Sequence, residues 1–333
     1  MKEDGDMEKI MMARGARTVV ETCLRVQPDE NVVIVAELSK LSIARSIANA
    51  VFAANANPMV ITMLPRQRDG QEPPLPVAAA MATSDAFVCC VHTSITHTSA
   101  GKAACEAGSR GVMLTQFTEE LMYRGELQAA SPAARRECLF VAAALGGAST
   151  VRLTTPGGTD LTFSAQGRRY NAMTCMVKKG EFSPVPTVEA NVSPLEETAN
   201  GVIVADASIP YIGIGLLQEP VICRVKDGFI TSIQGGWQAQ KLREDLAAKE
   251  DPNVYNIAEL GIGLNPACRF CGFMLEDEGV HGTAHIGIGT SITLGGTVKA
   301  ACHYDLIMTK PTVTADGVVV IREGEVCLYT DQR

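Results

Sequence analysis

Apolar residues in the first part of the chain form short continuous runs, separated by segments with helical spacing. The runs have the length and the β-branched content of buried strands: NVVIVAE (31–37), PMVITML (58–64), AFVCCVH (86–92) and GVMLTQ (111–116). The intervening segments predict helices: LSIARSIANAVFAANA (41–56), GKAACEAGS (101–109) and a long stretch over 118–147. Strands that alternate with helices indicate an α/β domain with a doubly wound parallel sheet.

The pattern changes after Gly146-Gly147, where strands alternate polar and apolar residues. The segment STVRLTTPGGTDLTFSAQGRRYNA (149–172) contains a PGG turn, and strands are predicted in 201–208, 219–235, 284–289 and 317–329. Two hairpins are expected at Lys226-Asp227-Gly228 and Arg322-Glu323-Gly324, and one helix over 238–248. We therefore predict an α/β domain over 1–145 and a mixed α+β, metal-binding catalytic domain over 146–333.

Composition narrows the class of protein. The chain has 333 residues, 46% of them hydrophobic, and a net charge of -8. Nucleic-acid binding needs basic patches, so the expected partner is a small-molecule substrate. No run approaches the length of a membrane span, and the N-terminus is acidic, so we expect no membrane association and a cytoplasmic protein.

The cysteines predict ordinary packing. Eleven cysteines are spread through a long chain and lie mostly in apolar runs, so we expect them to be reduced and buried. Cys268 and Cys271 form a CxxC pair without the second pair that a structural zinc requires. A metal or redox role for this pair is the less favoured alternative.

Candidate chemistry concentrates between Glu276 and Asp305, where three of the five histidines occur. His303 and Asp305 are two residues apart, so on a strand their side chains point to the same face. His285 begins a segment with alternating glycines, which is typical of a strand that approaches a ligand closely. Zinc, manganese and non-haem iron accept this combination of imidazole and carboxylate.

Each of these residues also has a structural alternative. Glu259 follows an apolar run, and a buried carboxylate needs a cation, a cap or an arginine nearby. A histidine such as His285 can be an ordinary core residue, and His281 is a weak candidate because Gly282 argues against a helix. In the acidic run 276–278 we expect Glu276 and Asp277 to face solvent and Glu278 to be a candidate catalytic residue.

The second half of the chain resembles two enzyme families. The segments AELGIGLNP, EDEGVHGTAHIGIG, LGGTVKAACHYDLIMTKPTV and ADGVVVIREG resemble the aminopeptidase T (M29-type) metallopeptidases. The segments EETANGVIVAD and DGFITSIQGGWQAQKLREDLAAKEDPNVYNI also resemble 2,5-dihydroxypyridine 5,6-dioxygenases, iron enzymes of the same superfamily. The likeness covers nearly the whole chain and is most specific in the second half.

The resemblance implies a set of metal ligands. Carried over from the aminopeptidases, these are Glu189, Glu259, His285, His303 and Asp305. Their tyrosine ligand corresponds to Ile292, which removes one expected ligand. The resemblance to the dioxygenases implies a mononuclear iron centre, in which a histidine stands at the position of Glu259. It also implies that His97, or as the weaker candidate His92, acts as an acid or base. The resemblance also implies a homodimer.

Two reactions follow as hypotheses. The leading one is a metal-dependent hydrolase that cleaves an amide or ring C–N bond of a small molecule, with Zn, Mn or Co and with Glu278 or His97 moving the proton. The alternative is a non-haem Fe(II) ring-cleaving dioxygenase acting on a hydroxylated pyridine-like N-heterocycle, with iron held by His303, Asp305 and either His285 or Glu259. A binding protein without catalytic activity is a third possibility.

Overall fold

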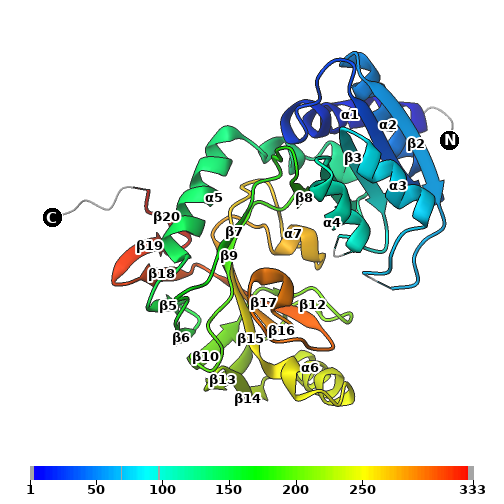
Figure 1. The fold of residues 1–333 in the computed structure, drawn as a ribbon. Helices are drawn as coiled ribbons and strands as arrows, with labels where there is room; N and C mark the ends of the chain where they lie inside the picture. Colours follow the sequence, from blue (N-terminus) through cyan, green and yellow to red (C-terminus); the bar gives the residue numbers. More distant parts are fainter. Residues whose placement is uncertain (1–3, 69, 97, 329–333) are drawn as a thin grey trace. The chain divides into compact units, whose positions relative to one another are not determined.

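The computed structural model describes residues 4–68, 70–96 and 98–328 (Figure 1). It divides into two compact units, each built from two stretches of chain. The first contains Met1–Pro132 and Met173–Pro186, and the second contains Ala133–Ala172 and Thr187–Arg333. Within the described residues, no helix combines the length and the apolar content that crossing a bilayer requires.

The first unit is built on a five-stranded sheet in the order β2-β1-β3-β4-β8. All of its ladders are parallel, which confirms the predicted parallel sheet. The strands are β1 (Asn31–Glu37), β2 (Asn57–Met63), β3 (Ala86–Val91), β4 (Arg110–Thr115) and β8 (Phe182–Pro184). The α-helices are α1 (Asp4–Arg17), α2 (Leu41–Ala53), α3 (Leu75–Thr83) and α4 (Ser99–Glu106), with single turns η1 (Thr18–Cys23) and η2 (Leu38–Lys40).

One predicted helix is wrong in part. The stretch 118–147 forms two 3₁₀ turns, η3 (Glu120–Met122) and η4 (Leu127–Ala129), before helix α5 (Pro132–Leu145) begins. Gly125 has φ 131°, a conformation that ends helical backbone, and Pro132 has no N–H to donate to a preceding turn. The helical residue types before Pro132 therefore form short turns instead of one continuous helix.

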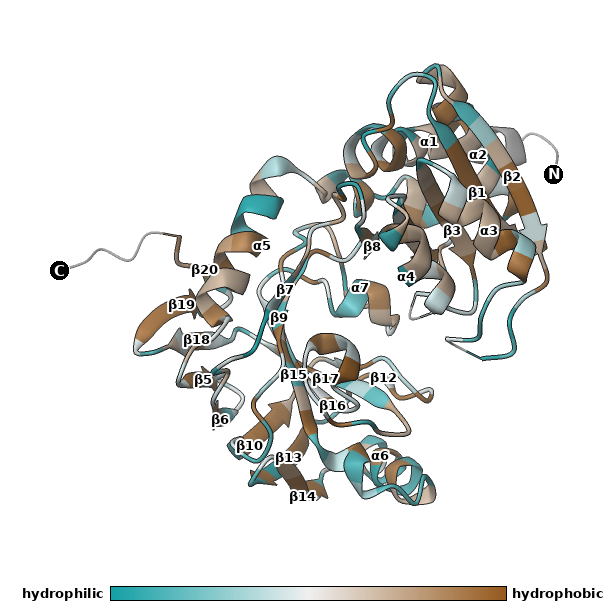
Figure 2. Cartoon of the chain, in the orientation of Figure 1, coloured by the Kyte–Doolittle hydropathy of each residue, from teal (hydrophilic) through white to brown (hydrophobic). Residues whose placement is uncertain are grey.

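The second unit contains two further sheets, and every strand pairing recorded in them is antiparallel. The eight-stranded sheet has the order β14-β13-β10-β6-β5-β18-β19-β20, and the seven-stranded sheet has the order β12-β11-β17-β16-β15-β9-β7. Figure 2 shows β10 and β19 largely hydrophobic, whereas α6 carries many polar residues.

The eight-stranded sheet is formed by β5 (Val151–Thr154), β6 (Asp160–Phe163), β10 (Asn200–Ala205), β13 (Val221–Lys226), β14 (Phe229–Gln234), β18 (Thr312–Ala315), β19 (Val318–Arg322) and β20 (Glu325–Val326). The seven-stranded sheet is formed by β7 (Tyr170–Met173), β9 (Glu189–Val192), β11 (Ser208–Ile209), β12 (Gly215–Leu216), β15 (Ile257–Gly263), β16 (Thr283–Gly289) and β17 (His303–Thr309). The helices are α6 (Trp237–Ala248) and α7 (Met274–Asp277), with η5 (Pro252–Tyr255) and η6 (Ile292–Leu294).

Both predicted hairpins are confirmed. β13 pairs with β14 across Asp227-Gly228, and β19 pairs with β20 across Glu323-Gly324. In each turn both residues have positive φ, 48° and 81° in the first and 49° and 91° in the second. Two consecutive left-handed residues match the twist of the flanking strands, and glycine at the second position adopts this conformation without strain.

The two compact units differ from the predicted domains in two segments. Helix α5 groups with the second unit, although the sequence pattern placed it with the first domain. The segment 173–186 groups with the first unit because β8 pairs with β4 in the parallel sheet. The division into domains at residue 145 stays a prediction.

Candidate metal centre

The seven-stranded sheet brings the predicted ligands onto neighbouring strands. Glu189 begins β9, Glu259 lies on β15 and His285 on β16, and His303 and Asp305 lie on β17. These four strands are adjacent in the sheet. Glu259 and Asp305 are both opposite Gly287, and His285 is opposite Gly261. Since residues opposite one another share a face, the acids and imidazoles rise from one side of the sheet.

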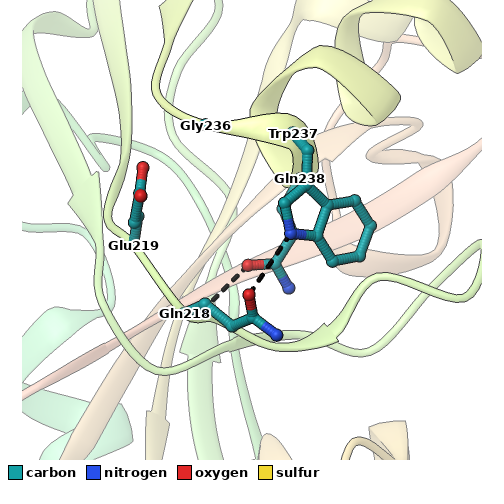
Figure 3. Close-up of a pocket in the computed structure, with 5 residues that line it drawn as sticks. All are labelled: Gln218, Glu219, Gly236, Trp237 and Gln238. Atoms are coloured by element: carbon teal, nitrogen blue, oxygen red, sulfur yellow. Dashed lines mark hydrogen bonds between the residues drawn. The ribbon is translucent and has the colours of Figure 1, made fainter.

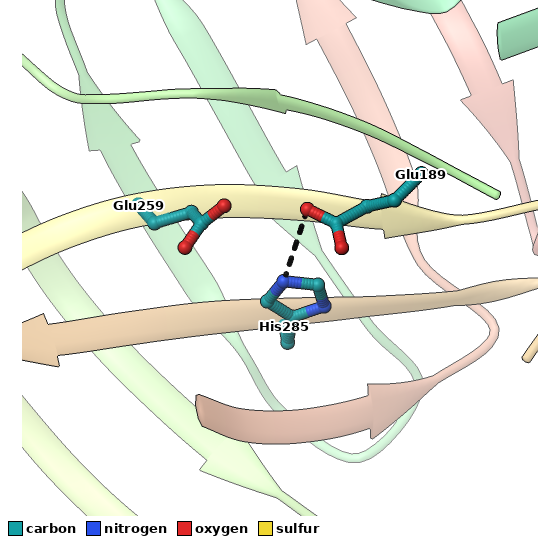
Figure 4. Close-up of side chains that lie close together, drawn as sticks. All are labelled: Glu189, Glu259 and His285. Carbon is teal, nitrogen blue, oxygen red and sulfur yellow. Dashed lines mark ion pairs between the residues drawn. The ribbon is translucent and has the colours of Figure 1, made fainter. Parts of the chain in front are cut away.

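The side chains form two donor groups that share one carboxylate. The first group is Glu189, Glu259 and His285, and the second is Glu259, His303 and Asp305; in each, the ligand atoms lie within 4.8 Å of one another. Figure 4 shows the first group converging from three strands, with His285 Nε2 3.6 Å from Glu189 Oε1. In the second group, His303 Nε2 lies 3.0 Å from Glu259 Oε2 and 3.3 Å from Asp305 Oδ1.

Glycines on the same face make room for the imidazole rings. A Cβ atom at Gly261 would lie 2.0 Å from His285 Nε2. A Cβ atom at Gly287 would lie 2.7 Å from His303 Cε1 and 2.8 Å from the Cβ atom of Glu259. The alternating glycines therefore allow other groups to approach the strand closely, as the sequence pattern predicted. The groups that occupy this space are the side chains of the candidate ligands.

Hydrogen bonds hold several of the ligand side chains in place. Asn191 Nδ2 donates to Glu189 Oε1 at 2.7 Å, and Tyr211 Oη donates to Asp305 Oδ2 at 2.5 Å. His303 Nδ1 lies 2.8 Å from the carbonyl oxygen of Thr290. A carbonyl only accepts, so Nδ1 carries the hydrogen and Nε2 faces the acids. Histidine ligands of metals are held in this way.

Two buried polar atoms in the centre have no hydrogen-bond partner among the described residues. They are His285 Nδ1 and Asp305 Oδ1. Asp305 Oδ1 faces His303 Nε2, as described above, and a buried carboxylate oxygen without a hydrogen bond is costly unless a cation neutralises it. The oxygen and nitrogen donors present are those that Zn, Mn and Fe(II) accept, so the residues fit a divalent metal.

The local charges also favour a cation. Burial raises the pKa of Glu259 to about 7, although His303 lowers it. Burial, followed by the charges of Glu189 and Asp305, holds the pKa of Glu278 well above its usual value. Burial alone would lower the pKa of His285, but Glu189 and the other acids raise it to about 10. Without a metal, protons compensate the excess negative charge of the centre.

Glu278, the predicted catalytic residue, is buried next to this centre. Thr187 Oγ1 donates to Glu278 Oε1 at 3.1 Å, and the charges of Glu189, Asp305 and His285 all act on it. Glu278 is therefore buried in the electrostatic environment of the candidate ligands. Its role stays a prediction.

The prediction that Glu276 and Asp277 face solvent is wrong. Both are buried, because the short helix α7 turns their carboxylates back onto the preceding loop. Asp277 accepts hydrogen bonds from the backbone N–H groups of Cys271 and Gly272 and from Ser208 Oγ. Three donors replace the water that this carboxylate would otherwise require.

The other candidates lie elsewhere or are not described. His97 is outside the described residues, and His92 is exposed after β3 in the first unit. His281 is half-buried and belongs to neither donor group, and Ile292 is 49% exposed in η6. Of the CxxC pair, Cys268 is buried and Cys271 is exposed, and within the described chain neither joins a donor group. All eleven cysteines are free thiols, and seven of them are buried as predicted; three others are half-buried and Cys271 is exposed.

Comparison with known proteins places the chain in a family. The model of the 2,5-dihydroxypyridine 5,6-dioxygenase family matches residues 12–328. The chain belongs to this family. A curated member, the 2,5-dihydroxypyridine 5,6-dioxygenase of Pseudomonas putida, is 26% identical over 214 residues, and this match spans 60% of each chain.

Solved structures support the fold. The structure of the 2,5-dihydroxypyridine dioxygenase of Pseudomonas putida KT2440 matches with a TM-score of 0.84 and 18% identity, covering 98% of this chain and 99% of that one. Wild-type AmpT from Thermus thermophilus matches with a TM-score of 0.70 and 17% identity, covering 96% and 100%. The resemblance to both branches of the superfamily is therefore confirmed at the level of fold, and membership at the level of sequence is in the dioxygenase family.

Proposed function

We propose that the protein is a non-haem Fe(II) dioxygenase that opens the ring of a hydroxylated pyridine-like N-heterocycle. The observation that carries the proposal is the donor group Glu259, His303 and Asp305, held on β15 and β17 on either side of β16, in a chain of the 2,5-dihydroxypyridine 5,6-dioxygenase family. The sequence alone favoured a hydrolase over a dioxygenase. We now rank the dioxygenase first, because the family model matches almost the whole chain.

The residues that would hold iron are His303 through Nε2, Asp305 through Oδ1 and Glu259. Iron supplies redox chemistry with O₂ that protein side chains lack. The group has one imidazole and two carboxylates, whereas the usual facial arrangement has two histidines and one carboxylate. The resemblance places a histidine at position 259 in the dioxygenases, so Glu259 is the departure in this chain.

The chain's own acids would manage the protons. Burial and the neighbouring acids hold the pKa of Glu278 well above its usual value, which favours the protonated form of this carboxyl group. A protonated, buried carboxyl group can donate to an oxygen or nitrogen of a bound substrate and later take the proton back. Thr187 would orient it through Oε1. His97 stays the predicted second acid or base.

The first donor group supports another candidate function. Glu189, Glu259 and His285 add a carboxylate-rich group beside the second donor group, and Glu259 belongs to both. Two hard ligand groups with a shared carboxylate suit a non-redox centre of Zn, Mn or Co, and such a centre would hydrolyse an amide or ring C–N bond. The hydrolase therefore remains as the second proposal.

Metal analysis and oxygen dependence separate the two. The protein would be purified without added metal, its metal content measured, and each of Fe(II), Zn, Mn and Co restored to the metal-free protein. With 2,5-dihydroxypyridine as the probe, the dioxygenase should consume one O₂ per ring opened, only with iron, and stop under argon. Turnover under argon with Zn, Mn or Co would overturn the dioxygenase proposal and support the hydrolase. Absence of metal binding would overturn both.

A further inference from the structure

We infer that Tyr211 is a positioning residue of the metal centre, whose phenol holds one oxygen of Asp305 so that the other oxygen faces the cation. Tyr211 was not identified from the sequence. The inference rests on the metal centre proposed above, and it is independent of which reaction occurs there. Its basis is the different environment of the two Asp305 oxygens.

The two oxygens of Asp305 are distinguished by their contacts. Oδ2 accepts the hydroxyl of Tyr211 at 2.5 Å. Oδ1 has no hydrogen bond from any described residue and lies 3.3 Å from His303 Nε2. A charge-assisted hydrogen bond of this length is strong and holds Oδ2 beside the phenol. Oδ1 is therefore left as the oxygen directed towards the other ligand atoms of the second donor group.

The loop that carries Tyr211 is tightly constrained. Tyr211 N donates to Ile209 O at 2.8 Å, and Ile214 N donates to Tyr211 O at 2.9 Å, so the residue lies in a compact reversal between β11 and β12. Ile212 and Gly213 have φ values of 49° and 70°, the left-handed backbone that this reversal requires. A side chain on such a loop keeps its direction better than one on an open loop.

Helix α6 holds the segment after Tyr211 through hydrogen bonds of the Gln238 side chain. Gln238 is buried, and its Nε2 donates to Leu216 O at 2.8 Å and to Ile214 O at 3.2 Å. Its Oε1 accepts from Gln218 N at 2.8 Å. Figure 3 shows this contact in a small surface pocket at the start of α6, beside the Trp237 ring. One side chain therefore satisfies three backbone groups of the segment that follows Tyr211.

The ring of Tyr211 is fixed as well as its loop. It packs against Tyr304 with ring centroids 5.0 Å apart, and Tyr304 Oη donates to Asp245 of α6 at 3.0 Å. Strand β11 pairs with β17 at Ser208 opposite Ile307, two residues beyond Asp305. The Tyr211 ring is therefore held by Tyr304, and its hydroxyl is held by Asp305.

The consequence concerns how Asp305 would bind. A carboxylate with one oxygen engaged in a short hydrogen bond offers a single oxygen to a metal, whereas a free carboxylate can rotate or bind through both. Single-oxygen binding leaves more positions of the metal open for other ligands. Outer hydrogen-bond partners of this type commonly change metal affinity by about 10–100-fold when they are removed.

Tyr211→Phe tests the inference, with Co²⁺ alone as the probe. The change keeps the ring and its packing against Tyr304 and removes only the hydroxyl. We expect Co²⁺ affinity, measured by competition with a chelator, to fall about 10–100-fold. We also expect the visible absorption of the bound Co²⁺ to change, because its coordination changes. Tyr304→Phe is the matched control, since its hydroxyl contacts Asp245 and no candidate ligand.

The outcomes are distinct. Unchanged affinity and an unchanged spectrum in Tyr211→Phe would overturn the inference, and an equal loss in Tyr304→Phe would assign the effect to packing and overturn it too. Thermal unfolding of the metal-free variants verifies that both are folded at the temperature of the titration. Failure of the unaltered protein to bind Co²⁺, Fe(II) or Zn would contradict the proposed metal centre itself, which is a separate result.

Discussion

His285 is buried among acidic side chains, and its protonation makes the stability of the folded state depend on pH. Its pKa of about 10 lies above its ordinary value of 6.5, despite burial, because of Glu189 and neighbouring carboxylates. A raised pKa stabilises the folded state fully below pH 6.5, and this stabilisation is lost as the pH rises towards 10. His303 is shifted in the same direction.

We therefore expect the metal-free protein to lose stability between pH 6.5 and pH 10, by at most about 1.4 kcal/mol per pH unit for each proton involved. Urea unfolding in the presence of a chelator, repeated across this range, measures the slope. His285→Gln should flatten it. A metal-free protein whose stability rises over the same range would contradict the assignment. Metal affinity should rise with pH, because a metal displaces these protons.

His303 is the only imidazole of the second donor group, so its removal should have the largest effect there. His303→Ala should lower metal content several-fold at equal protein concentration, since metal affinity depends on the number of strong ligands. His281→Ala is the matched control, because His281 is half-buried and belongs to neither donor group. Full metal content in His303→Ala would remove the basis of both proposed reactions.

The sequence predicted the arrangement of residues whose spacing determines which face of a strand they occupy. His303 and Asp305 are two apart on a strand, which places them on one face, and the structure has them so. It failed for Glu276 and Asp277, since a run of acids does not reveal the backbone donors of a loop that folds back on it. Tyr211 could not be found either, because its contact with Asp305 joins positions 94 residues apart.

At the level of strands, the centre depends on the glycines of β15 and β16. Gly261→Ala should displace the His285 ring, because the new Cβ atom would lie 2.0 Å from its Nε2. We expect loss of metal at the first donor group and a destabilisation of about 1–3 kcal/mol from overpacking. Metal analysis and thermal unfolding measure both effects.

A suitable control for Gly261→Ala is Gly101→Ala in α4. The nearest atom to its new Cβ would be 3.6 Å away, an ordinary contact, and alanine favours a helix. This variant should keep both its metal and its stability. If Gly261→Ala also kept its full metal content, the glycines would not be needed to accommodate the imidazoles.

Many strands were predictable because hydrophobic periodicity reports local burial. The parallel strands β1 to β4 and both hairpins followed from their patterns. Strands β9 and β15, which carry Glu189 and Glu259, were not among the predicted strands. Strand β8 was not predicted either, because it has only three residues, Phe182–Pro184, and is far from β4, its partner, in the sequence. Short strands lack the repeated alternation that a pattern requires.

For the whole molecule, metal should stabilise the second unit selectively, because both donor groups lie within it. Trp237, the single tryptophan, also belongs to this unit and reports its unfolding by fluorescence. At a metal concentration of 100 times Kd, the expected gain is about 2.7 kcal/mol. A tryptophan transition that stays fixed while the protein binds metal would contradict this expectation.

The shared position of Glu259 in both donor groups has a further consequence. An ion taken up by either group would neutralise part of the same carboxylate, so a later arrival would meet a weaker attraction together with repulsion from the earlier one. Loading of the two places should then be antagonistic. The protein would retain one ion firmly and exchange the other readily with its surroundings, and a stepwise calorimetric titration would reveal the two unequal affinities.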